Sequence, residues 1–214
     1  MQDRREIEGI QYLRGIAAVA VVIDHAAGMT ALPKYFGVTI SAGFLQRGYI
    51  GVDLFFMISG FIISIVSLQK ITLAPGSSIL DFARRRFFRI VPMMWLAIVS
   101  YAVLRLVTNE FPIWNYALAM VAAPFGDLDP DIIWTLRHEF IFYILFAASF
   151  LNRHFVLRWL LLVWFLLPVV ASIVGFAPND QSILSQTIAT LTHPANLEFG
   201  AGFLVGILWL RFSS

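Results

Sequence analysis

The stretch QYLRGIAAVAVVIDHAAGM, residues 11–29, is an apolar run into which Arg14, Asp24 and His25 are set. As an α-helix it is long enough to cross a hydrocarbon core of about 30 Å. An ionisable side chain in such a helix usually faces the interior of a bundle or a water-filled cavity, because contact with lipid is costly. The stretch therefore predicts a transmembrane helix that carries a functional polar stripe.

The composition of the whole chain supports a membrane protein. Hydrophobic residues make up 59% of its 214 residues, and the mean hydropathy is +0.80, whereas globular domains average about 45–50% apolar residues. No Gly/Ser-rich or Pro-rich linker divides the sequence. We expect one domain, residues 1–214, with an all-α fold: a polytopic transmembrane bundle of about six to eight segments.

The apolar segments are expected at residues 11–28, 51–68, 90–108, 113–126, 132–151, 156–174 and 197–210. The segment at 113–126 is short and lies between Pro112 and Pro124, so it is expected to be re-entrant or interfacial. Basic residues concentrate on the cytoplasmic side of membrane proteins. Arg4 and Arg5 precede the first segment, and residues 69–89 hold one lysine and four arginines. This bias predicts a cytoplasmic N-terminus.

Arg14 and His25 are the first candidate catalytic residues. Eleven positions separate them, which places them about 20° apart on one helix face and roughly 16 Å apart in depth. A neutral imidazole can take a proton from a hydroxyl group and return it to a leaving group. Two alternatives remain: Arg14 extends to the headgroups, and His25 makes a structural hydrogen bond to a neighbouring helix.

A second feature is the arginine cluster that precedes the third segment: Arg84, Arg85, Arg86 and Arg89. Guanidinium forks bind phosphate in a bidentate manner, so the cluster is a candidate site for a nucleotide-bearing donor such as coenzyme A. Control of topology or contact with anionic lipid explains the cluster equally well. Because the basic residues gather at one membrane edge rather than over a broad face, no nucleic acid is expected as a partner.

The segment IIWTLRHEFIFYILF at 132–146 carries the most polar insertion in an apolar run. Arg137 and Glu139 are expected to neutralise other intramembrane charges or to contact a substrate. A zinc-protease motif needs a histidine three residues after Glu139, where Phe142 stands, and cysteine is absent from the chain. We therefore expect no metal.

The segment GYIGVDLFFMISGFIIS at 48–64 places Asp53 and Ser59 among glycines. These two residues are candidates for a substrate cavity. The alternative is structural, because a carboxylate near a helix start is favourable and glycines allow close helix packing. Gly202 and Gly206 have the spacing of such a packing motif.

Five motifs together resemble the membrane acyltransferase-3 family, in particular its members that act on exopolysaccharides. In chain order they are QYLRGIAAVAVVIDH (11–25), GVDLFFMISGFIIS (51–64), RRRFFRIVP (84–92), WTLRHEFIFY (134–143) and LEFGAGFLVG (197–206). The first has the family's R-x10-H spacing on Arg14 and His25, and the fourth its W-[ST]-L-x-x-E-x-x-F-Y pattern.

The resemblance implies a bacterial inner-membrane enzyme that moves an acyl group, often acetyl, from cytoplasmic acyl-CoA to a hydroxyl of an exported or cell-envelope carbohydrate. Arg14, His25 and Glu139 would then be catalytic. The four clustered arginines would bind acyl-CoA, and a further set would line the substrate cavity: Asp53, Ser59, Trp134 and Arg137.

Family members are longer and have more helices, so the chain is expected to lack the last spans of the family fold. It is then a fragment, or a short member whose missing wall comes from a second copy or from partner helices. Membrane lipids are the other expected partner. Two functional alternatives stay open: a non-catalytic membrane subunit or exporter-like component, and an inactive truncated remnant.

Overall fold

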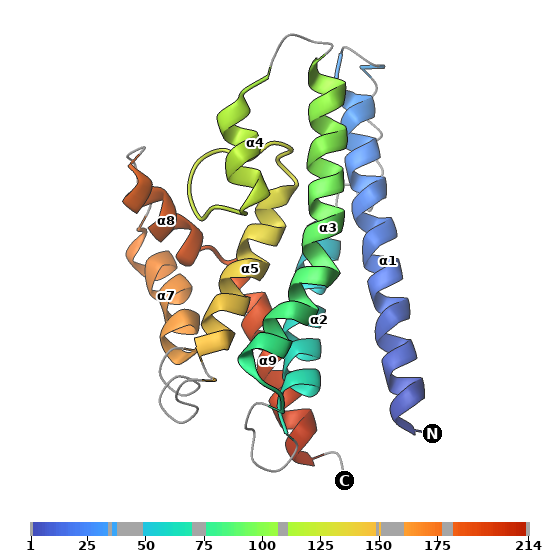
Figure 1. The fold of residues 1–214 in the computed structure, drawn as a ribbon, viewed down its shortest axis with the longest axis vertical. Helices are drawn as coiled ribbons and strands as arrows, with labels where there is room; N and C mark the ends of the chain where they lie inside the picture. The colour runs from blue at the N-terminus through green and yellow to red at the C-terminus, as the bar shows by residue number, and fades with distance from the viewer. Residues whose placement is uncertain are drawn as a thin grey trace.

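The computed structural model describes residues 2–33, 36–37, 49–69, 76–106, 111–148, 150, 161–176 and 182–212. Its elements are α1 (Gln2–Ala31), α2 (Tyr49–Ser67), α3 (Ile79–Leu106), α4 (Ile113–Met120), α5 (Ile133–Ala148), α7 (Leu161–Val174), α8 (Ile183–Leu191) and α9 (Ala195–Phe212) (Figure 1). The predicted all-α bundle is confirmed.

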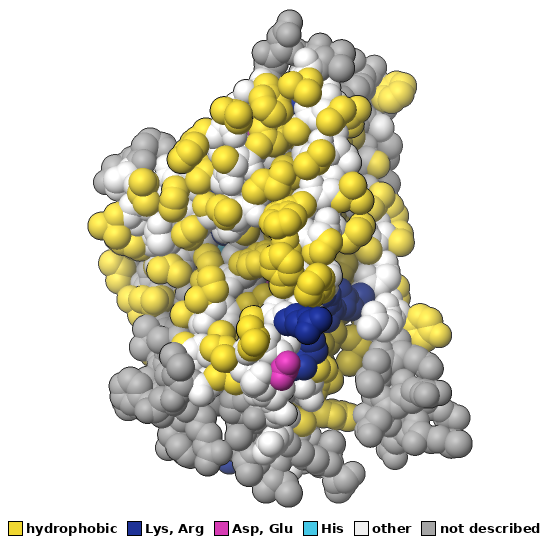
Figure 2. All heavy atoms as spheres, in the orientation of Figure 1, with side chains coloured by type: hydrophobic (Ala, Val, Ile, Leu, Met, Phe, Trp, Pro, Cys, Tyr) yellow, Lys and Arg dark blue, Asp and Glu magenta, His cyan; other side chains and the backbone are white. Residues whose placement is uncertain are grey.

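Four stretches of the described chain are long and apolar enough to cross a membrane: Gly9–Ala31, Ile50–Ser67, Ile79–Leu106 and Ile183–Phe212. The shorter helices α5 and α7 run alongside them (Figure 1). Large apolar side chains cover much of the outer surface (Figure 2). Such a surface is suited to contact with lipid, as expected for a membrane bundle.

Two predicted segments have different bounds in the structure. Helix α4 has only eight residues, about 12 Å of helix, and cannot cross a bilayer. The expectation that 113–126 does not cross therefore agrees with the structure. The third segment was expected to start at residue 90, but α3 begins at Ile79 and includes the arginine cluster.

A side-chain cap explains why α3 starts so early. The Asp81 backbone N–H donates to the Ser78 hydroxyl at 3.1 Å, and that hydroxyl donates to the Asp81 carboxylate at 2.7 Å. This reciprocal arrangement at a helix start resembles a capping box and satisfies an otherwise unpaired backbone donor. The arginines consequently sit at defined angles around a helix rather than in a loop.

Helices α2 and α9 form the most extensive contact between elements. Met57 lies against Gly202 and Ser64 against Gly206, a register in which the two helices run parallel. A Cβ atom added at Gly60 would overlap the Phe199 carbonyl oxygen, and one at Gly202 would overlap the Met57 carbonyl oxygen. The interface therefore requires glycine for direct backbone contact.

Two apolar clusters complete the interior. The first joins α2, α5 and α9 through aromatic residues such as Phe56, Phe142, Phe199 and Phe203. The second joins α3, α4 and α5 around Ile98 and Ala119. Helix α1, in contrast, packs mainly on α2, where Gly51 would bring an added Cβ to 2.7 Å from the Ala17 carbonyl oxygen.

We predict that Gly202→Ala destabilises the protein, because its Cβ would force α9 away from α2; overpacking of this kind costs about 1–3 kcal/mol. Gly28→Ala is the matched control, because no atom lies within 4 Å of a Cβ added at Gly28. Thermal unfolding in detergent, followed by size-exclusion chromatography, measures the difference. Equal melting temperatures for the two variants would contradict the close-packed interface.

Candidate active site

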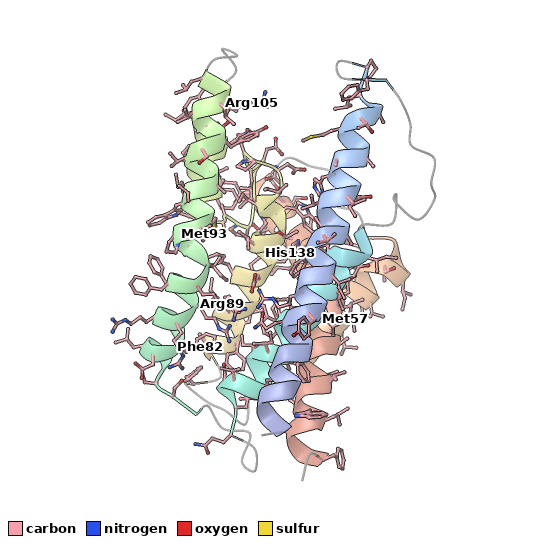
Figure 3. All side chains as sticks on the ribbon, turned by 90° about the vertical axis from the view of Figure 1, so that its right-hand side faces the viewer. Met57, Phe82, Arg89, Met93, Arg105 and His138 are labelled. Carbon is pink, nitrogen blue, oxygen red and sulfur yellow. The ribbon has the colours of Figure 1, made fainter. Side chains whose placement is uncertain are left out.

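Charged side chains from three helices come within electrostatic range of one another in the lower part of the bundle. Half-buried Arg14 of α1 lies within electrostatic range of Arg86 and Arg89 of α3 and of Glu139 and Tyr143 of α5. Arg89 lies on the side of α3 that faces α1 and α5 (Figure 3). Three guanidinium groups and one carboxylate thus influence one another electrostatically. We call these five residues the cationic cluster; its excess positive charge suits an anionic ligand.

Regular helix spacing builds this cluster. Arg86 and Arg89 are three residues apart and share a face of α3, and Glu139 and Tyr143 are four apart on α5. The Tyr143 hydroxyl donates a hydrogen bond to the Glu139 carboxylate. The Arg86 guanidinium carbon stands 5.2 Å from the centre of the Tyr143 ring, a cation–π contact. Tyr143 was not among the predicted site residues, although its position four residues after Glu139 places both side chains on one face of a helix.

The other two arginines of the predicted set lie elsewhere. Arg84 is exposed and stands 5.9 Å over the Phe88 ring. Arg85 donates a hydrogen bond to the Ser77 hydroxyl at 2.6 Å. The structure therefore divides the predicted group of four: Arg86 and Arg89 join Arg14, and Arg84 and Arg85 do not. Figure 2 shows basic side chains gathered over the lower part of α3.

His25 lies further along α1 and is exposed. Its Nδ1 is 2.9 Å from the Val21 carbonyl oxygen. A carbonyl only accepts, so Nδ1 carries the ring proton and Nε2 of the neutral ring is left as an acceptor. The eleven-residue spacing places His25 roughly 16 Å from Arg14 along the helix axis.

A second polar group lies where α2, α5 and α9 meet. Asp53 of α2 and Glu198 of α9 are within hydrogen-bond reach of each other. Ser59 is half-buried on α2. Glu198 was missed by the sequence analysis, because its partner is set by the register between α2 and α9.

A buried histidine connects α5 to the start of α9. His138 Nδ1 is 3.1 Å from the Asn196 side-chain oxygen. The ring centre of His138 is 4.8 Å from that of His193 and 5.8 Å from that of Trp134. Trp134, a predicted cavity residue, thus lies one helical turn before His138, and its contact with His193 was not predicted.

Arg137 has a defined structural role. It donates hydrogen bonds to the Phe125 carbonyl at 3.3 Å and to the Gly126 carbonyl at 2.6 Å. The Gly126 N–H in turn donates to the Gln186 side chain. Arg137 therefore ties the turn after α4 to α5, and α8 holds that turn from the other side. Its predicted contact with a substrate remains a prediction.

Among the described residues, no group of three or more His, Cys, Asp or Glu side chains is placed to hold a metal ion. The described part holds instead the cationic cluster and a histidine–asparagine pair, both of which include side chains of α5, in a bundle of apolar helices. These features define a polytopic membrane protein with ionisable side chains between its helices.

The chain belongs to the acyltransferase-3 family: the family model, described as an acyltransferase domain, matches residues 7–214. The exopolysaccharide production protein ExoZ of Rhizobium meliloti (strain 1021) is 34% identical over 176 residues, which cover 77% of this chain and 52% of that protein. The O-acetyltransferase OatA of Staphylococcus aureus (strain NCTC 8325 / PS 47) is 23% identical over 206 residues, covering 85% of this chain and 32% of that protein.

The O-acetyl transferase of Shigella phage Sf6 is 26% identical over 155 residues, which cover 64% of this chain and 44% of that protein. The chain thus spans about half or less of the length of these relatives. No solved structure matches it significantly.

We predict that Arg137→Met lowers the free energy of unfolding by about 1–3 kcal/mol, because two backbone carbonyls lose a charged donor. Cleavage by proteinase K within residues 121–131 should also become faster. Arg84→Met is the matched control, since this exposed arginine has no described hydrogen bond to the backbone. Wild-type cleavage and melting in Arg137→Met would count against the structural role.

Proposed function

We propose that the protein is a membrane O-acyltransferase, which moves an acyl group, in the first instance acetyl, from cytoplasmic acyl-CoA to a hydroxyl of an exported or cell-envelope carbohydrate. The observation that carries the proposal is the cationic cluster. It brings residues of three separate family motifs within electrostatic range of one another, which supports a shared site. The names of the relatives, which include two O-acetyltransferases and an exopolysaccharide production protein, agree with this reaction.

In this proposal the cationic cluster holds the phosphate groups of acyl-CoA. Arg14, Arg86 and Arg89 supply the positive charge, and Glu139 with Tyr143 keeps the guanidinium groups in place. The cluster lies on the side of His138 toward the start of α1, as Arg89 shows in Figure 3. The charge bias of the sequence assigns this end to the cytoplasm of a bacterial inner membrane, which is the side that contains acyl-CoA.

His25 is the proposed base of the reaction. Its Nε2 takes the proton from the acceptor hydroxyl as the oxygen attacks the thioester carbonyl; the thiolate of coenzyme A leaves and receives that proton from the imidazolium. A depth of roughly 16 Å between Arg14 and His25 suits a donor whose flexible pantetheine arm separates its phosphates from its thioester. The hydrogen bond to Val21 prepares the ring for this role by holding the proton on Nδ1.

The proposal predicts that His25→Ala abolishes glycan acylation in cells, because loss of a general base lowers a rate by about 10²–10⁴-fold. Mass spectrometry of envelope and secreted glycans compares wild-type cells, cells without the protein and cells with the variant. Immunoblotting of membrane fractions confirms that the variant is inserted. An unchanged glycan profile in cells without the protein would falsify the proposed function.

Donor binding is tested separately. Arg86→Ala should weaken acetyl-CoA binding by at least about tenfold, or about 1.4 kcal/mol, because a charge-assisted contact to phosphate is lost. Arg84→Ala, on the outer side of the same helix, should change it less than about twofold. Isothermal titration of purified protein in nanodiscs gives both constants. Equal losses in the two variants would instead indicate general electrostatic attraction to the basic end of α3.

A further inference from the structure

His138 is a buried histidine that the proposed reaction does not use. It occupies a variable position of the W-[ST]-L-x-x-E pattern, and only 4% of its surface is exposed. Adjacent residues of a helix point about 100° apart. Glu139 faces the cationic cluster, whereas His138 contacts Phe56 of α2 and Asn196 of α9. In Figure 3, His138 lies nearer the middle of the bundle than Arg89.

Asn196 determines which ring nitrogen of His138 carries the proton. The Asn196 amide nitrogen donates to the Thr190 carbonyl at 3.0 Å and to the Leu191 carbonyl at 2.9 Å. Both of its donors are thus used, so the Asn196 oxygen must face His138 as an acceptor. His138 Nδ1 therefore donates, and Nε2 of the neutral ring is left as an acceptor with a fixed direction.

Two aromatic rings lie next to this buried acceptor and are more accessible. His193 is exposed and Trp134 is half-buried, and their ring centres are 5.7 Å apart. Both rings also contact the His138 ring. Such side chains combine an apolar face with a polar edge. A pyranose ring presents the complementary surface, an apolar C–H face bordered by hydroxyl groups.

Small-molecule sites typically combine aromatic walls with a few convergent polar groups. Trp134 and His193 supply the aromatic walls here, and His138, which both rings contact, supplies a polar group beside them.

We infer that Trp134, His138 and His193 bind a pyranose unit of the acceptor carbohydrate, with His138 Nε2 accepting a hydrogen bond from one of its hydroxyl groups. The inference rests on the proposed function, because it assigns the acceptor of that reaction to a place in the fold. His138 and Glu139 are consecutive on α5, so this acceptor site adjoins the cationic cluster around the same helix. His138 is a binding residue in this scheme, and His25 remains the base.

Two substitutions separate binding from structure. The amide of asparagine replaces the Nδ1 position of histidine, so His138→Asn keeps a donor for Asn196 and loses the acceptor at Nε2. The amide of glutamine reaches the Nε2 position, so His138→Gln keeps an acceptor there and loses the bond to Asn196. A purely structural histidine would tolerate the first change better than the second in every assay.

The experiment is saturation-transfer NMR with methyl glycosides of glucose, galactose and mannose, on protein in nanodiscs free of glycoside detergents. We expect wild-type protein to bind at least one glycoside. His138→Asn should melt like wild type yet bind that sugar at least about tenfold more weakly. His138→Gln should melt earlier and keep sugar affinity within a few-fold. Acetyl-CoA affinity should be unchanged in both.

Wild-type sugar affinity in His138→Asn, or no sugar binding by a wild-type protein that binds acetyl-CoA, would overturn the inference. Should His138→Asn fail to fold, His193→Asn gives the same test at an exposed position. Asparagine there can still accept from the Ala195 N–H, which lies 3.2 Å from His193 Nδ1, but lacks the ring. Failure of the proposed function is seen separately, in the glycan profile of cells without the protein.

Discussion

The backbone contact between α2 and α9 is the constraint on which the rest of the arrangement depends. In lipid, apolar side chains gain little by leaving their surroundings, so helices associate through close packing and polar contacts. Gly60 and Gly202 allow that closeness, because a side chain at either position would overlap a backbone oxygen of the partner helix. The parallel register that results places Asp53 opposite Glu198 and brings Phe56 and Asn196 to the same histidine.

Several ionisable groups between the helices are compensated by another part of the chain. Arg14 would be costly alone in an apolar helix, but Glu139 of α5 opposes its charge. His138 is buried as a neutral ring held by an asparagine whose other bonds are all to backbone carbonyls. Arg137, which could have joined either polar group, is instead occupied by two carbonyls of the turn after α4.

Some of these features could be predicted from the sequence and others could not, for physical reasons. The all-α membrane fold followed from apolar runs, and the failure of 113–126 to cross followed from its length and prolines. The start of α3 was missed because one capping serine extends the helix through residues that look like a charged loop. Helix spacing does not separate Arg86 from Arg85, since both lie within about 60° of Arg89 around the helix, so that division required the structure. The Asp53–Glu198 and His138–Asn196 pairs required it as well, because a contact between helices far apart in the chain depends on register.

Helix α5 contributes side chains both to the cationic cluster and to the group around His138. Glu139 and Tyr143 face α1 and α3, whereas His138 and Trp134 face α2, α9 and the turn before α9. These residues alternate along one helix. A ligand that binds on either side of α5 therefore contacts side chains from the same stretch of that helix. In the proposed scheme, a donor with phosphates at the arginines and an acceptor at the histidines would therefore both contact α5. Trp134 and Tyr143, the ends of the W-[ST]-L-x-x-E-x-x-F-Y motif, are nine residues apart and so point to opposite sides of the helix; under the proposal they would contact different substrates.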